Sequence, residues 1–182
     1  MNEQPSIAGG DAQSPELVTA EFAPPALELS PTLDGSETIV RSVGLKDSKN
    51  DRLHHRAFKP RVGTNENSVT RLLVGEEEVK IRSRSAFDNR HDDYAGVAVC
   101  RVDQVQTLGV DVIDAPATYV GHANMIHPYP SPNLAPQNPE DPQLSRTNEE
   151  ADEHYKKVAT LFRFIRDSAP LQNSWSDGPM TA

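Results

Sequence analysis

The stretch Tyr94–His127, YAGVAVCRVDQVQTLGVDVIDAPATYVGHANMIH, decides the fold of this chain of 182 residues. It begins with an unbroken apolar run over 95–100, which contains two β-branched valines. Such side chains resist a helix and fit a pleated surface, and an uninterrupted apolar run has no solvent-facing side. The run therefore predicts a strand that is buried on both faces.

The residues that follow this strand predict a short helix and then two more strands. Asp103 is a suitable N-cap, Gln106 lies three residues later as its capping-box partner, and Gly109 can adopt the left-handed conformation that ends a helix. Strand-like residues return at 110–112 and at 118–126. A proline between them could not donate to a central ladder, so it separates two strands.

Upstream of the central stretch, the β-branched segment 68–74 predicts another strand, which ends at Gly75. The segment 83–91 is compatible with a helix that begins at Ser83 and turns Phe87 inward. The three glutamates between these segments are expected to form a solvated acidic patch.

The most regular pattern lies near the C-terminal end. Thr147 and Glu150 form a capping box, and apolar residues recur at spacings of three and four up to Ala169, just before Pro170. This pattern predicts one long helix over 147–169. The predicted fold class is therefore α+β: a small mixed or antiparallel sheet of four or five strands, a short helix, and the long C-terminal helix packed on one sheet face.

Composition divides the chain into a folded centre and two ends. Residues 1–45 contain five prolines among acidic and small residues and predict a disordered acidic arm, because so few apolar groups cannot offset the entropy of ordering. A single domain is expected over 46–170. Within it, 128–142 contains six prolines and predicts an extended loop. A flexible tail is expected over 171–182.

The formal charge of −9 is unevenly distributed along the chain. Residues 1–40 carry seven acids and no lysine or arginine, 41–101 carry nine acids and 13 bases, and 102–182 carry eleven acids and five bases. Binding to a polyanion needs a sustained basic face, so general nucleic-acid binding is not expected. The basic surplus of the middle segment is the one exception.

Cys100 is the only cysteine and lies inside an apolar run, which predicts a buried, inert thiol in a reducing compartment. No signal-peptide pattern and no run of 18 apolar residues is present, so no membrane association is expected and the predicted location is the cytoplasm. Neither a Walker loop nor a GxGxxG motif occurs, and no cofactor is predicted.

A first group of candidate site residues is His55, Arg56 and Lys59. An imidazole among fixed positive charges suits a neutral base, and the cations suit an anionic ligand. The alternative is a cluster of surface charges without a function, which is common in proteins.

A second group centres on His122, which could contact a ligand or act in catalysis, or could be a hydrogen-bonded core residue. Ser68 and Arg71 on the neighbouring predicted strand complete the candidate ligand contacts. Strand alternation places His122 and His127 on opposite faces, so they are poorly placed to bind one metal, and no metal site is predicted.

Short elements of the chain resemble, in the same order, those of a group of small uncharacterised bacterial proteins. They are RAFKP at 56–60, SV at 68–69, GV at 96–97, LGV at 108–110 and GHA at 121–123. The resemblance covers roughly 54–169, supports the domain limits and draws attention to Arg56, Phe58, Ser68 and His122. It implies no activity, and the acidic arm and the proline segment depart from it.

Two functions are compatible with these patterns. The leading prediction is a non-enzymatic accessory or protein-interaction module, in which the acidic arm and the proline segment dock another protein. The alternative is a small enzyme acting on a nucleotide or RNA phosphate, with His55 and His122 as acid and base and with Arg56 and Lys59 as anion contacts. Convergence of these side chains in one pocket would favour the enzyme.

Overall fold

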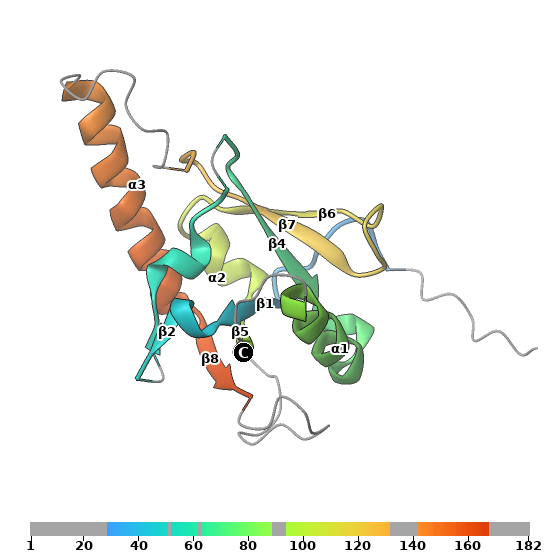
Figure 1. The fold of residues 1–182 in the computed structure, drawn as a ribbon. Helices are drawn as coiled ribbons and strands as arrows, with labels where there is room; N and C mark the ends of the chain where they lie inside the picture. Colours follow the sequence, from blue (N-terminus) through green and yellow to red (C-terminus); the bar gives the residue numbers. More distant parts are fainter. Residues whose placement is uncertain (1–28, 51, 62, 89–93, 132–141, 168–182) are drawn as a thin grey trace, which may run out of the picture.

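The structure, a computed structural model, describes residues 29–50, 52–61, 63–88, 94–131 and 142–167 (Figure 1). Six of its strands form one antiparallel sheet in the order β6-β7-β4-β1-β5-β8, and β2 and β3 form a separate two-stranded ribbon. The strands are β1 Thr38–Gly44, β2 Ser48–Lys49, β3 Arg52–Leu53, β4 Glu66–Arg71, β5 Tyr94–Arg101, β6 Asp111–Asp114, β7 His122–Ile126 and β8 Arg163–Arg166. The helices are α1 Glu76–Asp88, α2 Val102–Gln106 and α3 Pro142–Leu161, with 3₁₀ helices η1 Leu45–Asp47, η2 His55–Phe58 and η3 Leu72–Val74.

The predicted α+β class is confirmed, and the sheet is antiparallel with six strands rather than four or five. The central apolar run forms β5, which is buried on both faces as predicted. It lies between β1 and β8, and Gly96 permits the close approach to β8, because a Cβ at this position would lie 2.2 Å from the carbonyl oxygen of Ile165. The predicted short helix is also present as α2, and Gly109 adopts φ +73° after it.

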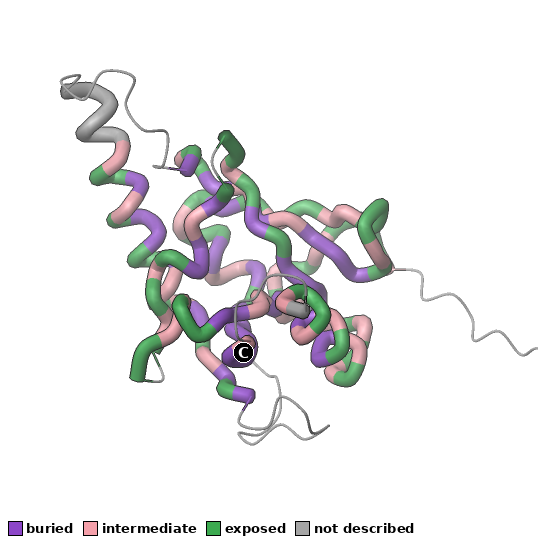
Figure 2. The backbone as a smooth tube through the Cα atoms, in the orientation of Figure 1, coloured by how far each residue is buried: buried purple, intermediate pink, exposed green. Residues whose placement is uncertain are grey.

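The hydrophobic core has two parts, one on each face of the sheet. The main core lies between one face and α2, α3 and η2, and the rings of Phe58 and Phe162, with centroids 4.5 Å apart, pack within it. A smaller core lies on the opposite face, where Val79 of α1 packs on Val40, Val97, Val99 and Ile165. Figure 2 shows buried positions along the inner strands, and on α3 buried and exposed positions alternate, as expected for a helix with one packed side.

The predicted domain boundary at residues 45 and 46 is wrong. Strand β1 lies between β4 and β5, and its Ile39 and Val40 are almost fully buried. Its β-branched residues Thr38, Ile39, Val40 and Val43 favour a strand, and the prolines before them concealed this signal. The rest of the predicted arm, residues 1–28, lies outside the described residues, as do most of the proline loop and the whole predicted tail.

The predicted helix over 147–169 is wrong in its second half. The helix ends at Leu161, and Arg163–Arg166 pair with β5 as strand β8. Phe162 and Ile165 continue the helical spacing, but Phe164 and Ile165 between two arginines also fit a short strand. Burial decides between these patterns, because Ile165 packs in the small core beneath α1.

The helix predicted to begin at Ser83 begins seven residues earlier, at Glu76. The three glutamates predicted as a surface patch form its first turn, where carboxylates interact favourably with the helix dipole. Ser83 is therefore inside the helix and buried, while Phe87 contacts the ring of Tyr94 at 5.7 Å between centroids.

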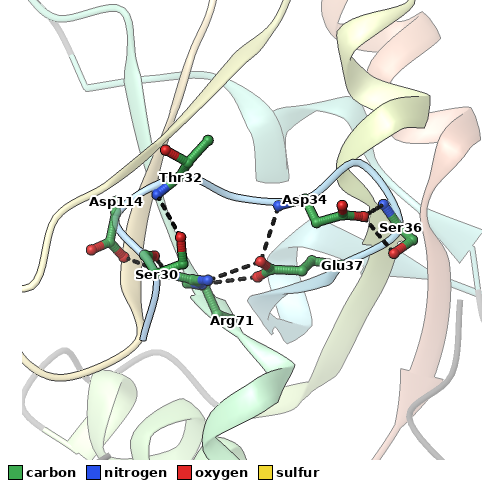
Figure 3. A network of polar contacts seen from close by, with 7 residues as sticks. All are labelled: Ser30, Thr32, Asp34, Ser36, Glu37, Arg71 and Asp114. Carbon is green, nitrogen blue, oxygen red and sulfur yellow. Dashed lines mark hydrogen bonds and ion pairs between the residues drawn. The ribbon is translucent and has the colours of Figure 1, made fainter. Parts of the chain in front are cut away.

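A buried arginine joins the N-terminal described segment to the sheet (Figure 3). The guanidinium of Arg71 on β4 donates to both carboxylate oxygens of Glu37, at 2.9 and 2.8 Å, and to Asp114 on β6 at 3.0 Å. It also donates to the backbone oxygen of Ser30 at 2.6 Å. Its side chain is 0% exposed, so these contacts balance a charge that is fully removed from water.

Candidate functional site

The candidate site begins on the part of the sheet that α1 leaves uncovered. The register of β4 with β7 places Ser68 opposite Asn124 and Thr70 opposite His122. Alternate residues of a strand share a face, so these four polar side chains lie on the same face of the sheet. This is the face on which Val40 of β1 packs against α1.

A groove of about 700 Å³ runs over these side chains. Four cationic residues and two acidic residues line it, together with hydroxyl, amide and imidazole groups. The cationic residues are Arg41, Lys59, Arg61 and Arg82; the acidic ones are Asp47 and Glu66; the neutral polar ones are Ser42, Thr64, Asn67, Ser68, Thr70, Ser85, Thr118, Tyr119, His122 and Asn124.

Arg41 connects β1 to the segments that border the groove. Strands β1 and β4 pair at two positions, Ile39 with Arg71 and Val40 with Thr70. One residue further along β1, Arg41 donates through Nη1 to the backbone oxygen of Ser68 at 2.6 Å and through Nε to that of Ala57 at 3.2 Å. A guanidinium thus holds β4 and η2 at the groove wall where the ladder pairing of β1 and β4 stops.

Tyr119 organises the other end of the groove. Its hydroxyl is 2.8 Å from the Oγ1 of Thr70, and its ring centroid is 4.9 Å from that of His122. The guanidinium carbon of Arg82 on α1 lies 4.1 Å from the ring centroid, a cation–π contact, and its Nη2 pairs with Glu78 one turn earlier. Within the part of the chain that the structure describes, the buried Nε of Arg82 has no hydrogen-bond partner. This N–H is a donor without an acceptor at the groove.

The turn before β7 determines which nitrogen of His122 donates. Its Nδ1 lies 3.0 Å from the backbone oxygen of Ala115. A carbonyl oxygen only accepts, so Nδ1 carries a proton, and in the neutral ring Nε2 keeps the lone pair. The imidazole can therefore accept a hydrogen bond from a ligand hydroxyl, or a proton.

The groove brings together three of the six predicted site residues, Lys59, Ser68 and His122. Lys59 comes from the end of η2, and Ser68 and His122 come from β4 and β7. Lys59 also forms an ion pair of 2.6 Å with Asp152 of α3, which places its ammonium group where η2 meets that helix.

His55 and Arg56 lie outside the groove lining. His55 is close to Lys59 and Asp152, and burial, followed by the charges of His54 and Lys59, lowers its pKa. Arg56 is exposed and donates to Asp47 at 3.2 Å. The predicted pairing of His55 and His122 as acid and base is therefore not assembled around this groove.

Arg71 does not line the groove. Four of its five N–H groups are used by Glu37, Asp114 and Ser30, and the side chain is fully enclosed. Its position supports a structural role instead of the predicted ligand contact.

Arg41, Arg82, Tyr119 and Asn124 were not predicted from the sequence. The polar residues at alternate positions of β4 and β7 carried a usable signal, because a two-sided strand with a polar face is typical of a surface or a site. Arg82 carried no such signal. The predicted helix began at Ser83, seven residues after the true start at Glu76, so Arg82 was not placed on a helix.

The described ranges lack a cluster of the side chains that commonly bind metal ions. These ranges contain no group of three or more histidine, cysteine, aspartate or glutamate side chains that could hold a metal ion. Nor does any helix in them have the length and apolar character needed to cross a membrane. Cys100 is buried, and this burial raises the pKa of its thiol to about 12.

Comparison with protein-family models, with curated proteins and with solved structures finds no match for this chain. Evidence on function therefore comes from the groove itself.

Proposed function

We propose that the protein is a non-catalytic binding module whose groove takes a small phosphorylated polyhydroxy compound, of the sugar-phosphate class. The observation that carries this proposal is the groove lining, in which four cations face two carboxylates among neutral hydroxyl, amide and imidazole groups. A net positive site with many neutral hydrogen-bonding groups suits a ligand with one anionic end and several hydroxyls.

The guanidinium of Arg82, which lines the groove beside Tyr119, supports an anionic end there. Its N–H groups can donate charge-assisted hydrogen bonds to phosphate oxygens. Because arginine holds its charge at any physiological pH, this contact favours an anion over a neutral acceptor.

Hydroxyl groups of the ligand would be held along the exposed side of β4 and β7. Ser68 and Asn124 can each donate and accept, and Nε2 of His122 accepts. A volume of about 700 Å³ exceeds that of a lone phosphate and lies in the usual range of small-molecule sites, so the ligand extends beyond its anionic group.

Docking of another protein by the acidic arm and the proline loop stays a prediction. Residues 1–28 and 132–141 lie outside the described residues, and β1 belongs to the sheet and is not available as a docking arm.

Catalysis is a second candidate function. It is favoured by the hydrogen bond that places a proton on Nδ1 of His122 and leaves Nε2 of the neutral ring as an acceptor. A neutral imidazole with a lone pair at the groove could accept a proton from a ligand hydroxyl. It would have to act without His55, which is not part of the groove lining.

The test is a titration followed by amide chemical shifts, with ribose 5-phosphate, ribose and inorganic phosphate as probes. The sugar phosphate should give saturable shifts at Ser68, Asn124 and the Arg82 turn, while ribose should not bind measurably. Arg82→Gln should weaken binding by about tenfold to a hundredfold, the value of one charge-assisted hydrogen bond.

Arg101→Gln is the matched control, because Arg101 is half-exposed, pairs with Asp103 and does not line the groove. Absence of saturable shifts with the sugar phosphate would rule out the proposal. So would equal losses of affinity in the two arginine variants.

A further inference from the structure

Three buried side chains form a hydrogen-bond chain from the sheet to α3. Asn67 of β4 is 3% exposed, His127 after β7 is 1% and His154 of α3 is 7%. Nδ2 of Asn67 lies 3.0 Å from Nε2 of His127, and Nδ1 of His127 lies 3.1 Å from Nε2 of His154. We call this chain the histidine latch.

A backbone carbonyl fixes the direction of every hydrogen bond in the latch. Nδ2 of Asn67 also lies 2.5 Å from the backbone oxygen of Phe58, which can only accept, so this atom is the amide nitrogen. It therefore donates to Nε2 of His127. His127 must then carry its proton on Nδ1 and donate to Nε2 of His154, whose own proton is left on Nδ1.

The latch has no position for a further proton. The lone pair of His127 accepts from Asn67, and the lone pair of His154 accepts from His127. A proton added at either lone pair would bring two N–H groups face to face between buried side chains. Protonation therefore requires that the hydrogen bonds of the latch break.

Other ionisable groups around the latch do not provide a buried counter-charge. Arg41 on β1 and Lys157 on α3 act on the pair from two sides and oppose a positive imidazole. Burial, followed by the charges of His154 and Arg41, lowers the pKa of His127 to about 3, and burial followed by Lys157 lowers the pKa of His154.

The glutamates of α3 lie toward solvent from the latch. Together with Tyr129, Leu108 and Pro128 they line a pocket of about 640 Å³ that also reaches His154. These carboxylates are Glu149, Glu150 and Glu153, and Glu153 forms an ion pair with Lys156. Two tyrosine rings also contact the latch: Tyr129 lies 5.3 Å from His154 and Tyr155 lies 5.1 Å from His127 between ring centroids, and the Tyr155 hydroxyl donates to the backbone oxygen of Tyr129 at 2.8 Å.

The latch is joined to the groove at two points. Asn67 is both the first member of the latch and a lining residue of the groove. Lys59, another lining residue, forms its ion pair with Asp152, two residues before His154 on α3. Two groups of the groove wall are thus linked to α3, Asn67 through the two imidazoles and Lys59 through its ion pair.

We propose that the histidine latch is a proton-released connection between α3 and the groove: it holds α3 in place when both imidazoles are neutral and releases it when either accepts a proton. Its effect on ligand binding rests on the proposed function of the groove, and its effect on α3 does not.

The direction of the pH dependence follows from which state of the latch binds the proton. The latched state excludes protons, and a released histidine binds one below its ordinary pKa of 6.5. The latch is therefore complete above this pH and is lost as the pH falls below it. Each pH unit lower reduces the ratio of latched to released protein by about tenfold for each excluded proton.

The test is hydrogen exchange of the ligand-free protein, with protection factors corrected for intrinsic exchange. Between about pH 7.5 and about pH 5.5 the protection of α3 should fall about tenfold for one excluded proton and about a hundredfold for two, while β1 and β5 keep theirs. Equal falls in α3, β1 and β5 would overturn the proposal, because the proton would then act on the whole fold.

Variants separate the latch from general acid sensitivity. His127→Gln with His154→Gln should leave α3 protection nearly independent of pH over this range. His54→Asn is the control, since His54 is exposed and its capping contact with the backbone N–H of Arg56 can be replaced by asparagine; it should behave as the native chain.

If the double variant does not fold, nitrogen shifts of the imidazoles in the native chain decide the question. Charged imidazoles at His127 and His154 would refute the latch if α3 kept its protection. Affinity for ribose 5-phosphate is measured separately at both pH values. Absence of binding at about pH 7.5 would refute the sugar-phosphate groove, whereas the exchange of α3 would still support or refute the latch.

Discussion

Replacement of Arg71 by methionine tests whether the buried arginine network holds the N-terminal described segment to the sheet. Methionine keeps much of the volume and removes the charge. Glu37 and Asp114, whose side chains are 9% and 10% exposed, would lose the guanidinium that now pairs with both. Two carboxylates would remain buried without a counter-charge.

The burial of both carboxylates sets the expected magnitude. Removal of one partner from a buried ion pair destabilises a protein by about 3–5 kcal/mol, because the remaining charge is uncompensated. A domain of this size has a total stability of about 5–15 kcal/mol, so Arg71→Met should lose a large part of it. The matched control is Arg101→Met, whose pair with Asp103 is 48% and 45% exposed, and it should lose less than about 1 kcal/mol.

Urea unfolding followed by far-ultraviolet circular dichroism measures both variants. A third protein, Arg71→Met with Glu37→Gln and Asp114→Asn, should recover part of the loss, since neutral amides are less costly to bury than charged groups. The reasoning is refuted if Arg71→Met and Arg101→Met lose equal stability, or if the triple variant is no more stable than Arg71→Met.

Three further variants or probes test the packing of the sheet and its helix. Gly96→Ala should lose about 2 kcal/mol or more and raise the exchange of β8 amides, because the new Cβ would meet the oxygen of Ile165 at 2.2 Å; normal β8 protection would contradict this. Cys100 should react with a thiol reagent only as fast as the protein unfolds, since burial raises its pKa to about 12, and rapid labelling of folded protein would be the contrary result. Val79→Ala should lose about 2 kcal/mol and Ile81→Ala less than about 0.5 kcal/mol in thermal unfolding, because Val79 is buried and Ile81 is 62% exposed; equal losses would contradict this orientation of α1.

Elements with a strong local signal could be predicted from the sequence. The strand now seen as β5 has an apolar run that no helix on a surface would show, and Gly109 ends the short helix where a left-handed residue is needed. Both predictions depend on neighbouring residues alone. They therefore did not require knowledge of the tertiary partners.

Elements decided by tertiary contacts could not be predicted in this way. Phe162 and Ile165 satisfy helical spacing, and only the pairing of β8 with β5 shows that they leave the helix. Strand β1 has β-branched residues but follows a proline-rich segment, and its place in the sheet depends on β4 and β5, which lie far along the chain. The assembly of the candidate site was hidden for the same reason, since its side chains come from β1, β4, α1 and β7.

The groove has a physical cause in the unequal covering of the sheet. On the face over which α1 packs, the buried apolar core residues come from β1, β5 and β8, where Val40, Val97 and Ile165 form the small core. On β4 and β7 the same face bears Ser68 and Asn124, which are not fully buried, and burying them against a second helix would cost their hydration unless each found a partner. The helix therefore stabilises one half of the face, and the other half remains available for a ligand that supplies those partners. On the proposed function, stability and ligand binding depend on different strands of the same sheet face, so apolar substitutions at the polar positions of β4 and β7 should weaken ligand binding more than folding.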